Sequence, residues 1–455
     1  MLAFTSLGLL AMPWASDAVI PEAKWRRRAM GAKPIDYSHL GGHPFERIKQ
    51  QNRRRLQHED LGDDWQHEPV KIPAEAKFDT NYFRPIRILF KYDHMPSSAN
   101  TQHHVTLLKE TVMPQVVDFW AKTLSVFPVK RLYVDSESCT LSDPQDYVYG
   151  VAGTDLLIQV VNNEKFCSGN TLAAANSCDW DDYDRPIGGL ISFCFSNIEI
   201  RNTEGHVSTS TIRKVVSAAI HEVAHILGFH ENDFAYFYDS ETGEPRTKRP
   251  IPQDVSHKCI TGKTESFDMP SETTVRQGET DSGIQYFELV TPKVVQVAQN
   301  HFNCPTLTGV RLENQDTGDA CIGTHFEERL YFTESMSAIA TSSSIPSYLS
   351  PLTLALFEDS GWYQANFTNV SISPFGHGRG CDFVKEPCIT NGNIPAYSKG
   401  VFCNKLSQTD YMCDSSHSII SHCDLIDYVF WPDLTPPPES YRYFDKPVRI
   451  LDSSF

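Results

Sequence analysis

Residues 206–230 constrain this chain most, because they combine a strong helical pattern with a pair of histidines. Apolar residues recur there at spacings of three and four, which is typical of one face of a helix. Ser208 to Ser210 can cap the first turn, and Gly228 can end the helix in a left-handed conformation. We therefore predict one long helix that packs on the core through a single stripe. The stripe consists of Ile212, Val216, Ala219, Val223, Ile226 and Leu227.

The histidines are His221 and His225, in the sequence His-Glu-Val-Ala-His. Residues four apart share a helix face, so both imidazoles can reach one metal ion. At about 100° per residue they fall nearly opposite the apolar stripe, which predicts that they face a cleft. Zn²⁺ in catalytic sites takes three protein ligands and keeps a position for water, from which Glu222 can take a proton. The pattern predicts one Zn²⁺ ion per chain, although three fixed letters also match by chance.

The third metal ligand has to come from another segment, and several residues are candidates. Compact metzincin peptidases place a histidine three residues after the glycine, but Glu231 stands there and His230 falls one position short. Glu358, from a later helix, would make the site one of a different zinc peptidase class. We favour His325, within the sequence Gly-Thr-His-Phe-Glu.

Twelve cysteines, all after residue 138, predict a disulfide-bonded protein of an oxidising compartment. Residues 1–18 are mostly apolar and end in small residues, which is typical of a signal peptide, although no basic residue begins it. Asn366 and Asn369 begin overlapping glycosylation sequons. No later stretch approaches the roughly 18 apolar residues that span a membrane, and the C-terminus has no hydrophobic tail for a lipid anchor. We expect a secreted or cell-surface monomer, with membrane-surface association left open.

The net charge of −17 argues against a nucleic-acid partner, which requires a basic surface.

Residues 19–80 hold two tribasic runs and no cysteine, so we interpret them as a propeptide or linker. An N-terminal catalytic subdomain at 81–230 is expected to follow. We interpret 231–320, rich in Pro, Thr, Asp and Gly, as an insertion held by Cys259 and Cys304. The regions expected beyond it are 321–370, with the third ligand and a C-terminal helix, and a Cys-rich region at 371–455.

Several shorter elements can be predicted from pattern alone. Residues 84–92, 155–161 and 187–195 are typical of strands, and 106–124 of a helix. A further helix should begin after Ser350 and end at Gly361. Gly188 and Gly189 in the third strand leave the backbone bare, which suits either close approach of another chain or a bulge.

With these motifs in order, the chain resembles the leishmanolysin family of metzincin metallopeptidases, including its invadolysin-like members. The resemblance covers roughly residues 84–445. It rests on HEVAHILGF at 221–229, GTHFE at 323–327, ESMS at 334–337, DRPIGG at 184–189, LSPLTLALFEDSGWY at 349–363 and GCDF at 380–383.

The resemblance implies an α+β fold: a metzincin-type catalytic domain of twisted sheet and active-site helix, a large insertion, and a disulfide-bonded C-terminal subdomain. It implies that His221, His225 and His325 bind zinc, that Glu222 is the general base, and that Met336 supports the site from a tight turn. It further implies cleavage of peptide or protein substrates, with the strand at 187–195 bordering the cleft so that a substrate can pair with it.

Departures from the family leave alternatives open. No cysteine precedes Cys139, so latency through a propeptide cysteine is not expected, and the Cys-rich region is expected to be shortened. An inactive member acting in adhesion remains an alternative, as does a zinc hydrolase acting on other bonds. No zinc-binding or catalytic position is substituted, which favours an active endopeptidase.

Overall fold

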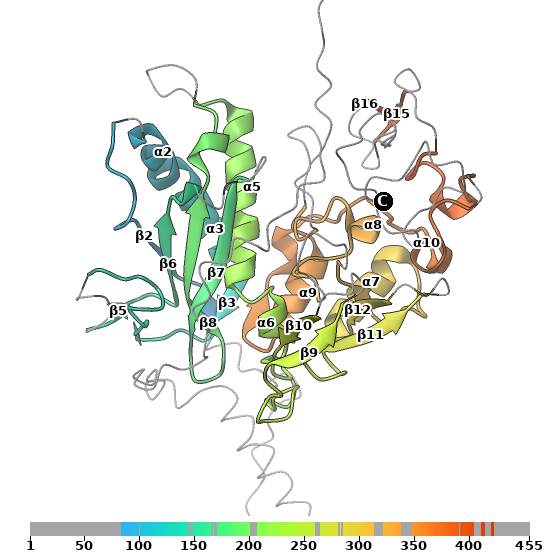
Figure 1. Ribbon diagram of the computed structural model, residues 1–455, viewed down its shortest axis with the longest axis horizontal. Coiled ribbons are helices and arrows are strands. Elements are labelled where there is room, and N and C mark those ends of the chain that lie inside the picture. The colour runs from blue at the N-terminus through green and yellow to red at the C-terminus, as the bar shows by residue number, and fades with distance from the viewer. Residues whose placement is uncertain are drawn as a thin grey trace, which may run out of the picture.

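The computed structural model describes residues 83–422 apart from gaps, the longest at 201–206, 314–321, 338–347, 405–410 and 415–419. The expected signal peptide, the segment 19–80 and the end of the Cys-rich region lie outside the described residues. The fold is α+β, as predicted (Figure 1).

A four-stranded sheet forms the framework of the N-terminal half, in the order β2-β6-β8-β7. Its first three strands run parallel and β7 runs antiparallel to β8. β6 and β8 are almost wholly apolar and buried, as expected of inner strands covered on both faces. The strands are β2 (Ile88–Lys91), β6 (Leu156–Val161), β7 (Ala173–Trp180) and β8 (Pro186–Phe193).

Helices cover one face of this sheet, and a smaller apolar cluster covers the other. Trp120 and Val116 of α3 and Val223 and Ile226 of α5 join the main core with apolar side chains of β6 and β8. The second cluster includes the Cys139–Cys178 disulfide. The N-terminal helical elements are α2 (Gln102–Thr106), the π-helix η3 (Leu107–Val112), α3 (Met113–Thr123), η5 (Phe195–Asn197) and α5 (Thr209–Ile226).

The C-terminal half lies on the far side of α5 from the sheet and packs small sheets against helices (Figure 1). One sheet, in the order β11-β12-β13, belongs to the region interpreted as an insertion. The elements of this half are α6 (Glu231–Phe234), β9 (Val255–Lys258), β10 (Thr264–Phe267), β11 (Val275–Glu279), β12 (Gln285–Leu289), α7 (Pro292–Phe302), β13 (Val310–Arg311), α8 (Glu328–Tyr331), α9 (Pro351–Asp359), α10 (Cys381–Lys385), η7 (Ala396–Ser398), β15 (Tyr411–Cys413) and β16 (Ile420–His422).

The segment after α9 joins the two halves through two kinds of contact. β14 pairs with β3, so the strand after α9 returns to the N-terminal half. The ring nitrogen of Trp362 donates to the carbonyl of Tyr183 (2.9 Å), and its ring packs over Gly228 at the end of α5. The remaining short elements are β1 (Arg84–Pro85), β3 (Leu124–Val126), β4 (Arg131–Leu132), β5 (Val151–Ala152), β14 (Tyr363–Ala365) and η6 (Phe367–Asn369).

The predicted elements are confirmed where the local pattern was strong. Strands β6 and β8 and helices α5 and α9 occur where expected. The segment 84–92 is instead divided between β1 and β2, which belong to different sheets. The helix expected at 106–124 begins earlier, in α2, and contains a π-helical stretch.

Disulfides are confirmed. The described bridges are Cys139–Cys178, Cys167–Cys194 and Cys304–Cys381, and Cys259 and Cys403 are also disulfide-bonded. Cys304 therefore ties the end of α7 to α10 in the C-terminal region and is not bonded to Cys259. Cys413 carries an exposed free thiol, so the prediction that every cysteine is bridged was wrong there.

Within the described residues, no helix is both long and apolar enough to cross a bilayer.

Candidate metal centre

Helix α5 carries the two paired histidines near its C-terminal end. Ser208 caps the helix through its hydroxyl group, which accepts from the amide of Thr211 (3.0 Å). At the other end Gly228 takes a positive φ of 111°, as predicted for a left-handed C-terminal turn. His221 and His225 lie one turn apart, so their rings meet on one side of the helix.

The two rings that were predicted to face a cleft are buried. His221 and His225 are only 5% and 7% exposed, and every residue from His221 to Ile226 is buried. Periodicity distinguishes the stripe that packs on the sheet, but it does not show what covers the opposite face. That face is covered by the segment carrying His325 and Met336.

His325 is held in place by backbone hydrogen bonds on two sides. Its carbonyl accepts from the amide of Glu313 (3.0 Å), and the amide of Phe326 donates to the carbonyl of Met336 (2.8 Å). The segment thus lies between the end of the β11-β12-β13 sheet and the turn at 334–337. Met336 is fully buried in that turn, which is closed by a hydrogen bond from the Ser337 amide to the Glu334 carbonyl (3.1 Å).

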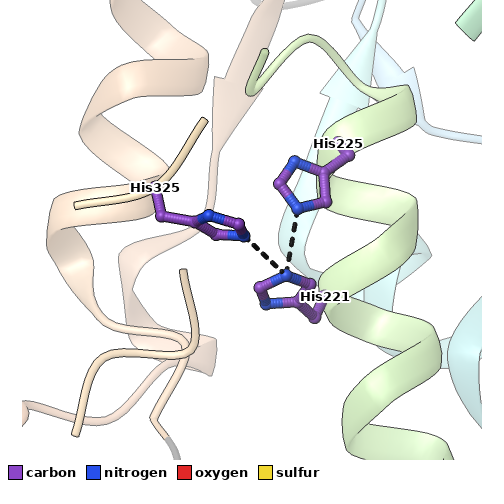
Figure 2. A group of neighbouring side chains, drawn as sticks. All are labelled: His221, His225 and His325. Carbon is purple, nitrogen blue, oxygen red and sulfur yellow. Dashed lines mark hydrogen bonds between the residues drawn. The ribbon is translucent and has the colours of Figure 1, made fainter. Parts of the chain in front are cut away.

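The three histidine rings converge through their Nε2 atoms (Figure 2). The Nε2 atom of His221 lies 3.0 Å from that of His225 and 3.2 Å from that of His325. Two nitrogens 2.0–2.1 Å from one tetrahedral Zn²⁺ would be about 3.3 Å apart, so the spacing fits zinc ligation. Among the described residues this is the one cluster of three or more candidate metal-binding side chains.

The alternative ligands lie outside this cluster. His230 Nδ1 is 3.0 Å from a carboxylate oxygen of Glu231, beside the short helix α6. Glu358 forms an ion pair with Lys293 (2.6 Å) on helix α7. Neither His230 nor Glu358 joins His221 and His225, which leaves His325 as the third member of the cluster.

The hydrogen bonds on the opposite ring nitrogens determine the tautomers. Nδ1 of His221 is 2.5 Å from the carbonyl of Ser335, and Nδ1 of His225 is 2.8 Å from the carbonyl of Phe229. A carbonyl oxygen can only accept, so both Nδ1 atoms carry the proton. Nδ1 of His325 faces the carboxylate of Glu313 at 2.8 Å, which selects the same tautomer.

It follows that the Nε2 atoms of the three rings, opposite these hydrogen-bonded nitrogens, point toward one another. Such an arrangement is repulsive on its own and favourable around a cation. Burial, together with a smaller effect of neighbouring His325, lowers the pKa of His221 to about 3. Burial likewise holds the pKa of His225 well below its ordinary value. His221 and His225 are therefore neutral at physiological pH, the form in which imidazole binds a metal.

Glu222 lies beside this centre and is 2% exposed. Burial raises the pKa of its carboxyl well above the ordinary value, and a hydrogen bond from the amide of Ala175 opposes that rise. Its Oε1 atom is buried and accepts no hydrogen bond from the described residues. A buried acceptor without a donor is costly in a structural role, whereas a group that handles protons needs a free oxygen.

The glycine-containing strand does not border the cleft as expected. β8 pairs with β6 on one side and β7 on the other, so it has no free edge. Its glycines are required by packing: an added Cβ would lie 2.7 Å from Cys139 Sγ at Gly188 and 2.5 Å from Ile226 Cγ2 at Gly189. The edge strand next to β8 is β7, which pairs with β8 alone among the described strands, and β2 forms the opposite edge of the sheet.

The hydrogen-bond partners of the three rings were not predicted from the sequence: the carboxylate of Glu313, the hydroxyl of Thr324 and the carbonyls of Ser335 and Phe229. No motif marks Glu313, and the role of the Ser335 backbone depends on how the turn is placed. The sequon residues lie far from the centre in η6 and its cap. There Asn366 is exposed, and Asn369 donates to the hydroxyl of Thr123 (2.7 Å).

Two histidines one turn apart on a helix, with a third from a distant segment, form a buried three-histidine metal site of the kind found in zinc metallopeptidases. Comparison with known proteins specifies the family. Residues 99–455 match the model of the leishmanolysin family, and the chain belongs to that family.

Individual relatives agree with this assignment. A leishmanolysin-like peptidase of Caenorhabditis briggsae is 30% identical over 461 residues, covering 84% of this chain and 66% of that protein. One from Drosophila melanogaster is 26% identical, covering 88% and 64%. The leishmanolysin of Leishmania donovani is 25% identical, covering 77% and 50%. The chain spans less than two thirds of the length of each of these relatives.

Proposed function

We propose that this protein is a zinc-dependent endopeptidase with a metzincin-type catalytic domain. The observation that carries the proposal is the convergence of three histidine Nε2 atoms next to a buried, partly unpartnered Glu222. In this proposal His221, His225 and His325 hold one Zn²⁺, and Met336 supports the site from below without binding the metal. Zinc in such a site acts as a Lewis acid toward the scissile carbonyl and activates a water molecule.

The protein's own groups supply the remaining chemistry. Glu222 is the general base: it takes a proton from the attacking water and delivers it to the leaving amine. Burial raises the pKa of its carboxyl well above the ordinary value, which helps it to hold the proton between the two steps. The hydrogen bond from Ala175 positions the carboxylate and also links it to strand β7.

The free edge of β7 supports a peptide as the substrate. An extended chain can add to an exposed sheet edge through backbone hydrogen bonds. Because Ala175 belongs to β7 and donates to Glu222, a peptide paired there would run close to the catalytic base. This replaces the role first expected of the glycine-containing strand β8. A zinc hydrolase acting on small molecules would have no use for such an edge.

The alternative of an inactive adhesion protein is less well supported, since all four residues of the centre are present and grouped together. Export through the secretory pathway is also part of the proposal. The several disulfides support it, together with the apolar segment 1–18 and the sequons at Asn366 and Asn369. We include glycosylation at those asparagines.

Proteolysis of casein by the purified full chain tests the proposed activity. Cleavage should stop when a zinc chelator is added and return when Zn²⁺ is restored. His225→Ala, which removes one proposed ligand, should be inactive under all three conditions. Cleavage that persists in the chelator would contradict a metal-dependent mechanism, and a correctly folded wild-type protein that never cleaves casein or other unfolded proteins would favour the adhesion alternative.

A further inference from the structure

The third histidine is attached to the sheet of the proposed insertion. Strand β12 pairs with β13, and beyond β13 the amide of Leu312 donates to the carbonyl of Phe287 (2.9 Å). The segment of His325 pairs with residues 311–313 on the side that faces away from β12. Leu312 bridges Phe326, and the amide of Glu327 donates to the carbonyl of Arg311 (3.0 Å). The loop that carries His325 therefore lies beside the end of β13 and is held there by an isolated bridge and backbone hydrogen bonds.

Glu313 lies two residues after β13, directly beside His325 on the neighbouring loop. Its Oε1 atom lies 2.8 Å from Nδ1 of His325, and both side chains are buried, at 10% and 6% exposure. The acceptors at the other two rings are neutral carbonyl oxygens, whereas this acceptor is a carboxylate. Thr324 offers its hydroxyl group to the same nitrogen at a longer distance of 3.2 Å.

Gly323 provides the room for this contact. A Cβ atom at position 323 would lie 2.3 Å from Glu313 Cγ and 2.3 Å from the Glu313 carbonyl oxygen. A real Cβ atom cannot come that close to backbone, so any larger residue would move Glu313 away from His325 or displace the loop. The motif Gly-Thr-His-Phe therefore needs glycine at position 323 because Glu313 packs against it, and not because its backbone has a positive φ.

We propose that Glu313 is the positioning residue of the third metal ligand, so that the insertion helps to build the metal centre. A charge-assisted hydrogen bond is about twice as strong as a neutral one, and it fixes the tautomer and orientation of the ring. A carboxylate partner also raises the basicity of the ligating nitrogen. His325 needs this most, because it lies on a loop, whereas His221 and His225 are fixed by their helix.

The proposal rests on the proposed zinc site, so its test measures zinc binding directly. Zinc affinity is determined by competition with a chelating dye for wild type, Glu313→Gln and Glu313→Ala. Loss of such a partner typically weakens metal affinity 10- to 100-fold. We expect that range for Glu313→Ala and a smaller loss for Glu313→Gln, whose amide oxygen still accepts from the ring. Zinc affinity within twofold of wild type in Glu313→Ala would overturn the proposal.

Two controls separate positioning from general stability. Glu288→Gln removes another buried carboxylate of the same sheet, one that pairs with Arg276 and not with a histidine. Thr324→Val removes the longer contact to the same ring nitrogen. Both variants should bind zinc like wild type, and a loss as large as that of Glu313→Ala in either one would contradict the assignment.

Thermal unfolding of the metal-free proteins completes the test. If Glu313→Ala is strongly destabilised without metal, the near-isosteric Glu313→Gln decides: weakened zinc binding at unchanged metal-free stability supports positioning, and unchanged binding refutes it. A wild-type protein that binds no zinc would instead refute the proposed metal centre itself.

Discussion

Replacing Glu222 by glutamine tests the proposed chemistry most directly, because it exchanges one oxygen for nitrogen and leaves the shape of the side chain unchanged. The Gln oxygen can still accept from the amide of Ala175, but the group can no longer take a proton. A positioned general base contributes typically 10²- to 10⁴-fold to a rate. We therefore expect kcat/KM to fall by that factor, which corresponds to about 3 to 5 kcal/mol in the barrier.

The same substitution should not destabilise the protein. Burial disfavours the ionised carboxyl, so the pKa of Glu222 is higher in the folded than in the unfolded chain. As pH rises above the unfolded value, the unfolded chain loses this proton first, and the metal-free wild type loses stability. Glutamine has no such pH dependence, so metal-free Glu222→Gln should be at least as stable as wild type at neutral pH.

The test compares wild type and Glu222→Gln in three assays: casein proteolysis, zinc affinity and thermal unfolding. The expected result is a variant with normal zinc affinity, an undiminished Tm without metal, and at least a 100-fold loss of activity. Activity within tenfold of wild type would refute the role of Glu222 as base. Loss of zinc or a large fall in Tm would show that the side chain is mainly structural.

Three further results are expected. Zinc at 100 times its Kd should stabilise the chelated protein by about 2.7 kcal/mol and raise Tm by several degrees, because the three histidines join α5 to a distant segment; calorimetry with Mg²⁺ as the control would show no difference if the metal site were absent. Gly189→Ala should cost about 1 to 3 kcal/mol in urea unfolding, since its Cβ would lie 2.5 Å from Ile226 Cγ2, and an unchanged midpoint would contradict the close packing. Burial raises the pKa of Glu334 from 4.5 to about 7, so the folded chain keeps this proton longer and the free energy of unfolding should fall as pH rises between those values, by on the order of 3 kcal/mol. Glu334→Gln should lack this component of the pH dependence, and identical slopes for the two proteins would contradict it.

Local pattern was sufficient where one segment contained the whole signal. Helix α5 could be predicted from spacing, from Ser208 and from Gly228, and helix α9 from Ser350 and Gly361. In both helices the capping hydroxyl group and the terminal glycine act on neighbours within a few residues, so the sequence contains the necessary information.

The strands show where local pattern is insufficient. The apolar run of β8 predicts a buried strand, but whether a strand is an inner or an edge strand depends on its partners. The glycines were interpreted as a possible approach site for another chain, whereas they accommodate a disulfide and Ile226. The edge strand β7 has a mixed sequence, and no periodic pattern predicted a strand there.

What the sequence by itself determined is the identity of the proposed ligands: a histidine pair one helical turn apart with Glu222 between them, and His325 as the third. These follow from residue type and spacing, together with the resemblance to a known family. Only the tertiary structure decided how the rings are held. The Ser335 carbonyl, the Glu313 carboxylate and the burial that lowers the pKa of His221 and His225 all come from segments brought together by folding. Hydrogen bonds and desolvation depend on distance in space, and spacing along the chain does not report it across a hundred residues.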